Sequence, residues 1–278
     1  MNQGIEFLKG HGTENDFVLL PDPTGSLDLT PSRVRALCDR HRGLGADGVL
    51  RVVPGALVLD APPGTSPDDW FMDYRNADGS VAELCGSGVR VLVRYLTDTG
   101  LVTSPEFRIG SRSGPRRVRR NDDGSVTVEM GRVRRDGIST VTVEGEAFTG
   151  LAVDVGNPHL ACLTEVPVEH LDLTVPPGHD PAAFPHGVNV EFVNVLCAGQ
   201  LRMRVHERGV GETRSCGTGT VAALAAALAA EGRESGEADV QLPGGRVHVA
   251  IAEDGSTLTG PAVLVAAGWL DLNWWSTH

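Results

Sequence analysis

The chain has 278 residues, of which 41% are apolar, and it carries a formal net charge of −12 at pH 7. This length predicts about two domains of ordinary size, each with its own core. The negative charge argues against nucleic acid or an anionic membrane as the main partner, because both repel an acidic surface. No segment has the pattern of a signal peptide or of a membrane span, and we expect a cytoplasmic protein.

The cysteine and lysine content limits which kinds of active site the chain is expected to contain. Five cysteines at wide spacing predict free thiols in a reducing compartment rather than a disulfide framework. The sequence has no Cys-x-x-Cys or His-Glu-x-x-His motif, so we expect no metal site. Lys9 is the only lysine and has no phosphate-binding loop beside it. Since pyridoxal phosphate enzymes need a Schiff-base lysine, we expect an activity without that cofactor, and no cofactor is predicted.

The first half is predicted to consist of short strands and turns on both sides of one long helix. Thr30 and Pro31 form an N-cap and a first helical position, and this shorter helix is predicted to run to about Arg40. Gly43-Leu-Gly-Ala-Asp-Gly48 matches a dinucleotide-binding pattern, but a helix precedes it and a strand follows it. A dinucleotide site requires the opposite order, so we interpret the segment as a helix-to-strand turn. Strands are predicted at 17–20, 49–53, 70–74, 107–109, 118–120, 126–130 and 140–143, and turns at 122–124 and 135–137.

The long helix of the first half begins at a cysteine. Cys85-Gly-Ser-Gly88 precedes residues 89–96, whose apolar spacing is helical. A thiol at a helix N-terminus lies among unpaired backbone N–H groups, which favour negative charge. The position therefore favours a thiolate and also offers an anion site. One such turn taken alone is more often a structural cysteine.

The second half repeats this plan. Cys216-Gly-Thr-Gly219 precedes an Ala-rich helix over 220–230, and it follows Cys85 by almost half the chain, as an internal repeat would. A tight turn is predicted at Gly156-Asn-Pro-His159. Two such turns, each opening a helix, indicate a duplicated unit with two facing thiols. Strands are predicted at 151–155, 160–163, 188–195, 201–206, 239–242, 247–251 and 262–267.

Two opposed thiols suit the inversion of a carbon centre. One acts as a thiolate base on one face of the carbon, and the other delivers a proton to the opposite face as an acid. The α-proton of an amino acid is hard to remove without a cofactor, because the resulting carbanion is poorly stabilised. Two helix N-termini directed at the substrate carboxylate would stabilise the charge that builds on its oxygens.

Four separated motifs together resemble the diaminopimelate epimerase family, and the resemblance runs from about residue 7 to Leu272. It implies an α+β fold of two pseudo-symmetric domains, each a mainly antiparallel sheet or barrel wrapped around a central helix, with the active site in the interdomain cleft. The implied domains are 1–132, with 263–278 returning to it, and 133–262. The motifs are His11-Gly-x-x-Asn-Asp-Phe17, Asn76-Ala-Asp-Gly-Ser-x4-Cys85-Gly, Gly156-Asn-Pro-His159 and Glu207-Arg-Gly-x-Gly-Glu-Thr-x-x-Cys216-Gly-Thr-Gly219.

The resemblance implies an isomerase that interconverts LL- and meso-diaminopimelate, without a cofactor, in lysine and cell-wall precursor synthesis. Cys85 and Cys216 would be the acid/base pair, and His159 and Glu207 would tune and orient the thiols. We expect a small-molecule amino-acid substrate and a homodimer. The distal amino-acid head of the substrate is expected at Asn15, Asn76, Asn157, Asn189 and Arg208. The reacting carboxylate is expected at the backbone N–H groups of Gly86, Ser87, Gly217 and Thr218.

Some alternatives stay open. The chain departs from the family at Ser87, where Asn is usual, and at Gly48, where Gln is frequent, which leaves the exact substrate preference open. The main alternative is a related racemase or epimerase of proline, hydroxyproline or another amino acid, because Cys216-Gly-Thr-Gly219 alone fits it. The Glu207-Arg-Gly segment and the asparagines argue for a second zwitterionic head instead. Singly, these asparagines are typical of turns. A non-enzymatic protein of the same fold is expected to lack one thiol, yet both are present.

Overall fold

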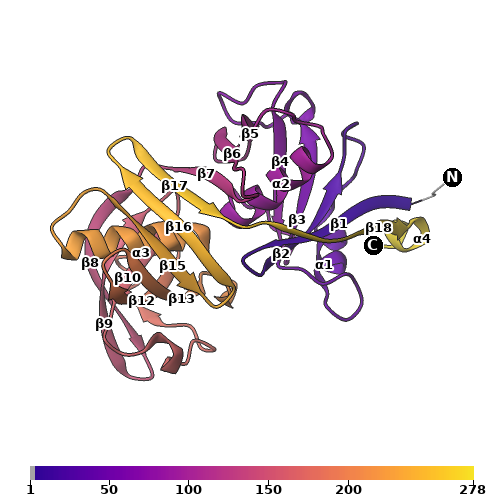
Figure 1. The fold of residues 1–278 in the computed structure, drawn as a ribbon. Coiled ribbons are helices and arrows are strands. Elements are labelled where there is room, and N and C mark those ends of the chain that lie inside the picture. The colour runs from indigo at the N-terminus through magenta and orange to yellow at the C-terminus, as the bar shows by residue number, and fades with distance from the viewer. Residues whose placement is uncertain (1–3) are drawn as a thin grey trace. The chain divides into compact units, whose positions relative to one another are not determined.

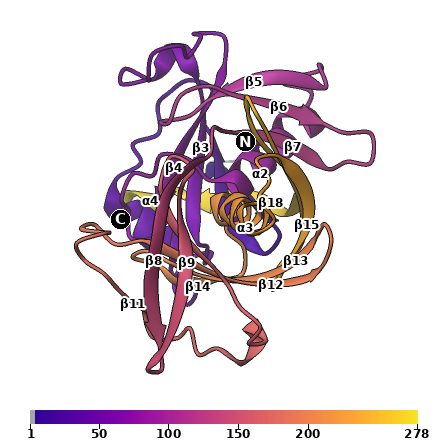
Figure 2. The same cartoon turned by 90° about the vertical axis from the view of Figure 1, so that its left-hand side faces the viewer.

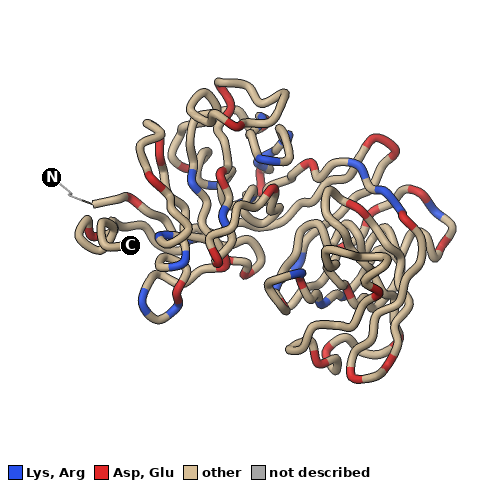
Figure 3. Tube along the Cα trace, turned by 180° about the vertical axis from the view of Figure 1, so that it is seen from behind, with Lys and Arg blue, Asp and Glu red and all other residues tan. Residues whose placement is uncertain are grey.

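The computed structural model describes residues 4–278, which form two compact units. The first unit holds the described chain up to Val128 together with Pro261–His278, and the second is Glu129–Gly260. Each is built mostly of strands around one longer helix, so the predicted α+β class is confirmed (Figure 1). No helix within residues 4–278 is long and apolar enough to cross a membrane. Acidic and basic residues are interspersed along both units (Figure 3).

In the first unit the first and last strands of the described chain lie side by side. The first strand pairs antiparallel with the last one, and its other edge pairs with the second strand. The second and third strands are parallel, and the fourth and fifth are too, while the remaining pairs are antiparallel. The strands are β1 (Gly4–Gly12), β2 (Asn15–Pro21), β3 (Gly48–Pro54), β4 (Trp70–Asn76), β5 (Glu106–Gly110), β6 (Arg116–Arg120), β7 (Val126–Gly131) and β18 (Val263–Asp271).

Helix α2 (Gly86–Asp98) is the centre of the first unit. Most of its residues are buried, and it contacts β1, β2, β3, β4, β6 and β18. Helix α1 (Pro31–Cys38) begins at Thr30, whose hydroxyl oxygen accepts the N–H of Arg33 at 3.2 Å. It ends at Cys38 rather than near Arg40, because the backbone of Asp39 is extended. Shorter helical elements are η1 (Gly55–Leu57) and α4 (Leu272–Ser276).

Helix α3 (Gly217–Ala230) has the same place in the second unit, and Figure 2 shows it end-on with strands around it. It contacts β9, β10, β12, β13, β15, β16 and β17. Its many alanines leave little side chain between helix and strands, which lets the strands approach closely. The elements around it are β8 (Arg134–Val143), β9 (Glu146–Asp154), β10 (Pro158–Leu163), η2 (Val168–His170), β11 (Gly178–His179), β12 (Asn189–Cys197), β13 (Gln200–Glu207), β14 (Gly211–Thr213), β15 (Gly236–Leu242), β16 (Gly245–Ala252) and β17 (Gly255–Gly260).

Two parallel pairings decide which residues meet in this unit. β10 lies parallel to β12, with His159 opposite Asn189, and β13 lies parallel to β15. The other main pairs are antiparallel. Phe148 of β9 and Phe192 of β12 pack edge to face, with ring centroids 5.1 Å apart, in a hydrophobic core that they share with residues of β8 and β10.

One predicted turn is wrong. Residues 135–137 lie inside β8, where the register against β9 shifts between Arg135 and Gly137. The shift is a β-bulge, and Gly137 has φ +115°, a conformation that glycine adopts without a steric penalty. The Asp-Gly pair therefore bends a strand instead of ending it. Strands β1, β11, β14 and β17 and helix α4 were not predicted.

Candidate functional site

Cys85 is the N-cap residue of α2. Its backbone is extended, with φ −141° and ψ 114°, and its Sγ accepts the N–H of Gly88 at 3.4 Å. Gly86 and Ser87 are the first two residues of the helix, as predicted. The backbone N–H groups of a first helical turn have no acceptor within the helix. This end of α2 therefore offers a thiol and an anion site together.

Asn15, at the start of β2, connects this thiol to a carboxylate. Its Oδ1 accepts the Cys85 thiol at 3.4 Å, and its Nδ2 donates to Asp47 Oδ2 at 2.9 Å. Asp47 also accepts from the backbone N–H of Asp16 and from the guanidinium of Arg40. Burial raises the pKa of Asp47, and the neighbouring Asp16 raises it further. These bonds determine which end of the Asn15 amide faces Cys85, a role for Asp47 that the sequence analysis missed.

Arg90 places a positive charge behind the same turn. It is fully buried, and within residues 4–278 no carboxylate pairs with it. Burial lowers its pKa to about 10, so the side chain is charged at neutral pH, and this charge attracts the Cys85 thiolate. Its guanidinium donates to four neutral acceptors at 3.0–3.4 Å, which are Thr13 Oγ1, Ser87 Oγ, Pro261 O and Gly86 O.

The structure shows what surrounds Ser87 and Gly48, the two positions at which the sequence departs from the pattern of the family that it resembles. Ser87 is fully buried, and its hydroxyl accepts one of the Arg90 bonds. Gly48 begins β3, where an added Cβ would lie 2.6 Å from the carbonyl oxygen of Arg75. No side chain fits there unless β3 and β4 move apart. Position 48 therefore supplies backbone only.

Cys216 is the N-cap residue of α3, with nearly the same backbone as Cys85, at φ −130° and ψ 115°. Its thiol lies 3.6 Å from Thr218 Oγ1. Gly217 and Thr218 are the first two residues of the helix. Burial raises the pKa of Cys216 well above its usual value, and the carboxyls of Glu207 and Glu191 raise it further. Cys216 is therefore a thiol, not a thiolate, at neutral pH.

Glu207, at the end of β13, bonds directly to this cysteine. Its carboxyl accepts the Cys216 thiol and the hydroxyl of Thr213. Burial raises the pKa of Glu207, and these two bonds oppose the rise. Glu207 thus lies beside a thiol, and its role in tuning and orienting that thiol stays a prediction.

His159 lies fully buried at the start of β10. Its Nε2 is 2.9 Å from Asn157 Oδ1, and its Nδ1 is 2.7 Å from Glu191 Oε1. Asn157 in turn donates its Nδ2 to Thr218 Oγ1 at 3.5 Å. Three predicted residues, His159, Asn157 and Thr218, are thus joined in one chain of hydrogen bonds. Glu191 is fully buried on β12 and was not predicted.

The remaining predicted residues divide into two cases. Asn189 donates to Pro158 O at 3.1 Å and accepts the backbone N–H of Arg208 at 2.9 Å, so both lie beside the His159 turn. The Arg208 guanidinium donates to His186 O at 3.2 Å. Asn76 instead donates to Ser80 Oγ at 3.0 Å within its own turn, which is the turn role considered for it above.

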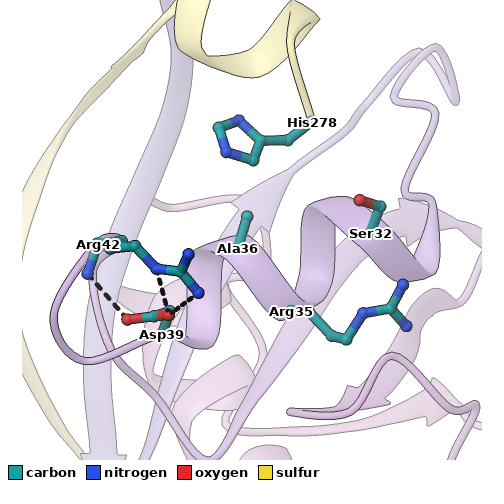
Figure 4. Close-up of a pocket in the computed structure, with 6 residues that line it drawn as sticks. All are labelled: Ser32, Arg35, Ala36, Asp39, Arg42 and His278. Carbon is teal, nitrogen blue, oxygen red and sulfur yellow. Dashed lines mark hydrogen bonds and ion pairs between the residues drawn. The ribbon is translucent and has the colours of Figure 1, made fainter.

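A separate pocket lies beside α1 and the C-terminal residue His278 (Figure 4). It contains none of the predicted site residues. Arg42 in this pocket is paired with Asp39, and Arg35 donates one hydrogen bond to Asp78 O. Within residues 4–278, no three His, Cys, Asp or Glu side chains are grouped to hold a metal ion.

Solved structures with this fold define its class. The chain matches a hydroxyproline epimerase from Agrobacterium vitis with a TM-score of 0.66, at 17% identity, over 96% of this chain and 92% of that one. It matches a phenazine biosynthesis protein of the PhzF family from Bacillus anthracis with a TM-score of 0.68, at 14% identity, over 97% of this chain and 100% of that one. At such identities the likeness shows the fold alone, an α+β fold shared with amino-acid epimerases.

Sequence comparison identifies the family. The family described as diaminopimelate epimerase matches residues 7–135 and 151–265. A diaminopimelate epimerase from Rhodococcus opacus is 58% identical over 98% of this chain and 99% of its own length. Another from Mycolicibacterium smegmatis is 55% identical, over 97% of this chain and 98% of its own length. The chain belongs to the diaminopimelate epimerase family.

Replacing Asp47 by alanine is expected to weaken substrate binding through Asn15. The Asn15 amide would lose its charged partner and be free to turn, and hydrogen bonds to charged groups contribute about 1.5–3 kcal/mol. We therefore expect KM for diaminopimelate to rise by roughly tenfold or more, with a smaller change in kcat. Asp39→Ala, which removes a carboxylate that bonds to Arg42 at the end of α1, is the control. Equal KM values for the two variants would refute this role of Asp47.

Proposed function

We propose that this chain inverts an α-carbon of diaminopimelate, interconverting the LL and meso forms by proton transfer between the substrate and two cysteines. Membership of the family supports the substrate, in a pathway to lysine and cell-wall precursors. The observation that carries the mechanism is that Cys85 and Cys216 are both N-caps of long helices with nearly the same backbone conformation. Each copy thus combines a thiol with a helix N-terminus.

The surroundings of the two thiols divide the roles between them. Cys85 donates to Asn15 Oδ1 when it is protonated, and the buried cation Arg90 nearby favours loss of that proton to give the thiolate. Cys216 has two buried carboxyls nearby, which favour its thiol. A base on one face and an acid on the other is the starting state that inversion needs. We infer that the resting enzyme holds Cys85 as the base and Cys216 as the acid, and that the reverse reaction starts from the opposite state.

The reaction also needs donors that stabilise negative charge on the substrate carboxylate, and we assign this role to the N-terminal ends of α2 and α3. As the α-proton leaves, negative charge builds on the oxygens of the adjacent carboxylate. The backbone N–H groups of Gly86, Ser87, Gly217 and Thr218 are unpaired within their helices, so they are the donors proposed for that charge. In other enzymes, loss of one such donor costs about 3 kcal/mol. Several donors acting together replace the electron sink that a cofactor supplies elsewhere.

The other predicted residues have supporting roles in this proposal. Glu207 accepts a hydrogen bond from the Cys216 thiol and orients that thiol. The distal amino-acid head is assigned to Asn15, Asn76, Asn157, Asn189 and Arg208. We further propose a cytoplasmic homodimer. Free thiols at all five cysteines support a reducing compartment.

Isotope exchange tests the substrate assignment. In deuterium oxide, the enzyme should place deuterium on the α-carbon of LL-diaminopimelate and leave proline unchanged. Two ammonium–carboxylate heads distinguish the first substrate from the second, and only the asparagines and Arg208 recognise the extra head. Exchange with proline alone would contradict the proposal and favour a proline-type racemase.

Alkylation tests the assignment of base and acid. Only the thiolate reacts with iodoacetamide. Because the pKa of Cys216 is raised, little of its thiolate exists at neutral pH, and its alkylation should accelerate as pH increases into the alkaline range. Peptide mass spectrometry after brief treatment at pH 7 should therefore find Cys85 modified before Cys216. Faster labelling of Cys216 would reverse the roles assigned here.

A further inference from the structure

Glu191 is a buried acid that the mechanism above does not use for proton transfer. It lies in the middle of β12, and its side chain is fully buried. Its Oε1 bonds to His159 Nδ1 at 2.7 Å. Its other oxygen, Oε2, is buried with no hydrogen-bond partner among residues 4–278. A buried carboxyl with an unsatisfied oxygen is costly, so its presence calls for a role.

The first turn of α3 leaves space for the Glu191 carboxyl because it has a glycine at position 219. An added Cβ on Gly219 would lie 2.7 Å from Glu191 Oε1. The second glycine of Cys216-Gly-Thr-Gly219 is therefore required for close approach of Glu191 to the helix. Glu191 consequently lies between the Cys216–Gly219 turn and the His159 ring.

The net charge of the buried Glu191–His159 pair limits how many protons it carries. A carboxylate beside a neutral imidazole carries a net charge of about −1, and a buried unbalanced charge is strongly disfavoured. The titratable groups that face the pair are Glu207 on β13, Cys216 on α3 and Cys162 on β10, and none of them can supply a positive charge. Burial also raises the pKa of Glu191, while His159 opposes that rise. One added proton makes the pair neutral overall.

The added proton can lie on His159 or on Glu191, and in both cases Nε2 of the His159 ring carries a hydrogen. If it is on the imidazole, Nδ1–H donates to the carboxylate and Nε2 also carries hydrogen. If it is on Glu191, the acid donates to Nδ1, and the ring hydrogen is again on Nε2. In either case Nε2–H donates to Asn157 Oδ1. The amide of Asn157 is then held with its Nδ2–H toward Thr218.

We propose that Glu191 is a positioning residue, which keeps hydrogen on His159 Nε2 and so fixes the Asn157 amide with its N–H donors toward the first turn of α3. The value of this orientation for turnover rests on the proposed function, in which Asn157 contacts the substrate. The protonation of His159 does not rest on it. The two claims can therefore fail separately.

Nitrogen-15 NMR of the histidine rings in the full-length chain tests this inference. His159 is assigned by the signal that a His159→Gln variant loses. The wild-type protein at pH 7 to 8 should show a protonated Nε2. A bare Nε2 would overturn the proposal, and this result needs neither turnover nor a mutant of Glu191. If Nε2 is protonated but diaminopimelate is not epimerised, the proposed function fails and this inference stands.

Two variants extend the test. Glu191→Met is similar in length but can neither donate to Nδ1 nor accept from it, so the ring hydrogen is no longer held on Nε2. We expect the Nε2 signal to move toward the unprotonated form and KM for diaminopimelate to rise at least tenfold. Gly219→Ala should produce the same NMR change by displacing Glu191 without altering charge. An unchanged Nε2 signal in a folded Glu191→Met variant would overturn the proposal.

A matched control is available in the same unit. Glu237 is exposed on β15, and one of its carboxylate oxygens lies 3.7 Å from His248 Nε2. Glu237→Met also removes one carboxylate beside a histidine, but this pair is open to water. The variant should leave both the His159 signal and KM at their wild-type values. A KM change as large as that of Glu191→Met would show that the effect is not specific to the buried pair.

Discussion

Replacing either Cys85 or Cys216 by serine should lower kcat by on the order of 10²- to 10⁴-fold, the usual contribution of a positioned acid or base. Serine keeps the size and the hydrogen-bonding capacity of cysteine. Its hydroxyl, however, does not ionise near neutral pH, so it can neither take up the α-proton nor return one at the needed rate. KM should change little, since the backbone donors of both helix ends remain. The rate of isomer interconversion, followed by chromatography, measures the effect.

The chain offers a matched control for these variants. Cys197 is exposed at the end of β12 and is not at a helix N-terminus. Cys197→Ser should therefore retain wild-type kcat. Turnover at the wild-type rate in Cys85→Ser or Cys216→Ser would refute a mechanism that needs both thiols.

Glu207→Gln should have the next largest effect. The amide can still accept the Thr213 hydroxyl, but the negative charge near Cys216 is lost. Since Glu207 raises the pKa of that thiol, its removal lowers the pKa. The alkaline limb of the pH–rate profile, where the acid loses its proton, should move down by about one pH unit or more. At pH values above the lowered pKa we expect kcat/KM to be roughly tenfold below that of the wild type, while near neutral pH it should stay close to the wild-type value.

The factor by which Glu207→Gln lowers kcat/KM must be the same in both reaction directions. The equilibrium between the LL and meso forms belongs to the substrate, so an enzyme variant changes both kcat/KM values by one factor. Glu212→Gln removes an acid that pairs with Arg204 and should leave the pH profile in place. An alkaline limb that stays at its wild-type pH in Glu207→Gln would show that Glu207 does not act on Cys216.

The two cysteine turns and their helices were predictable because their signals are local. Each helix follows glycines that free the backbone, and its apolar residues repeat along the chain next to the turn. The extended conformation of an N-cap residue follows from the same local pattern. The positions of Cys85, Gly86, Ser87, Cys216, Gly217 and Thr218 at helix N-termini therefore needed no knowledge of tertiary structure.

The supporting residues were not predictable, because their roles depend on neighbouring strands. Glu191 lies in an alternating stretch and has the pattern of an outward-facing strand residue. It is buried because β12 pairs with β10 on one side and β13 on the other, beneath α3. Asp47 lies in a glycine-rich turn, and only the pairing of β2 with β3 brings it to Asn15. Arg90 has a helical position that alone says nothing of its burial.

The central claim is that two different groups act on the two faces of one carbon, and the early course of the reaction in deuterium oxide tests it most directly. With LL-diaminopimelate as substrate, Cys85 removes protium while Cys216, already equilibrated with solvent, delivers deuterium. The account predicts that newly formed meso product carries deuterium at the inverted carbon while the remaining LL substrate still carries protium. Equal deuterium in substrate and product from the earliest times would show a single base serving both faces and would contradict the account.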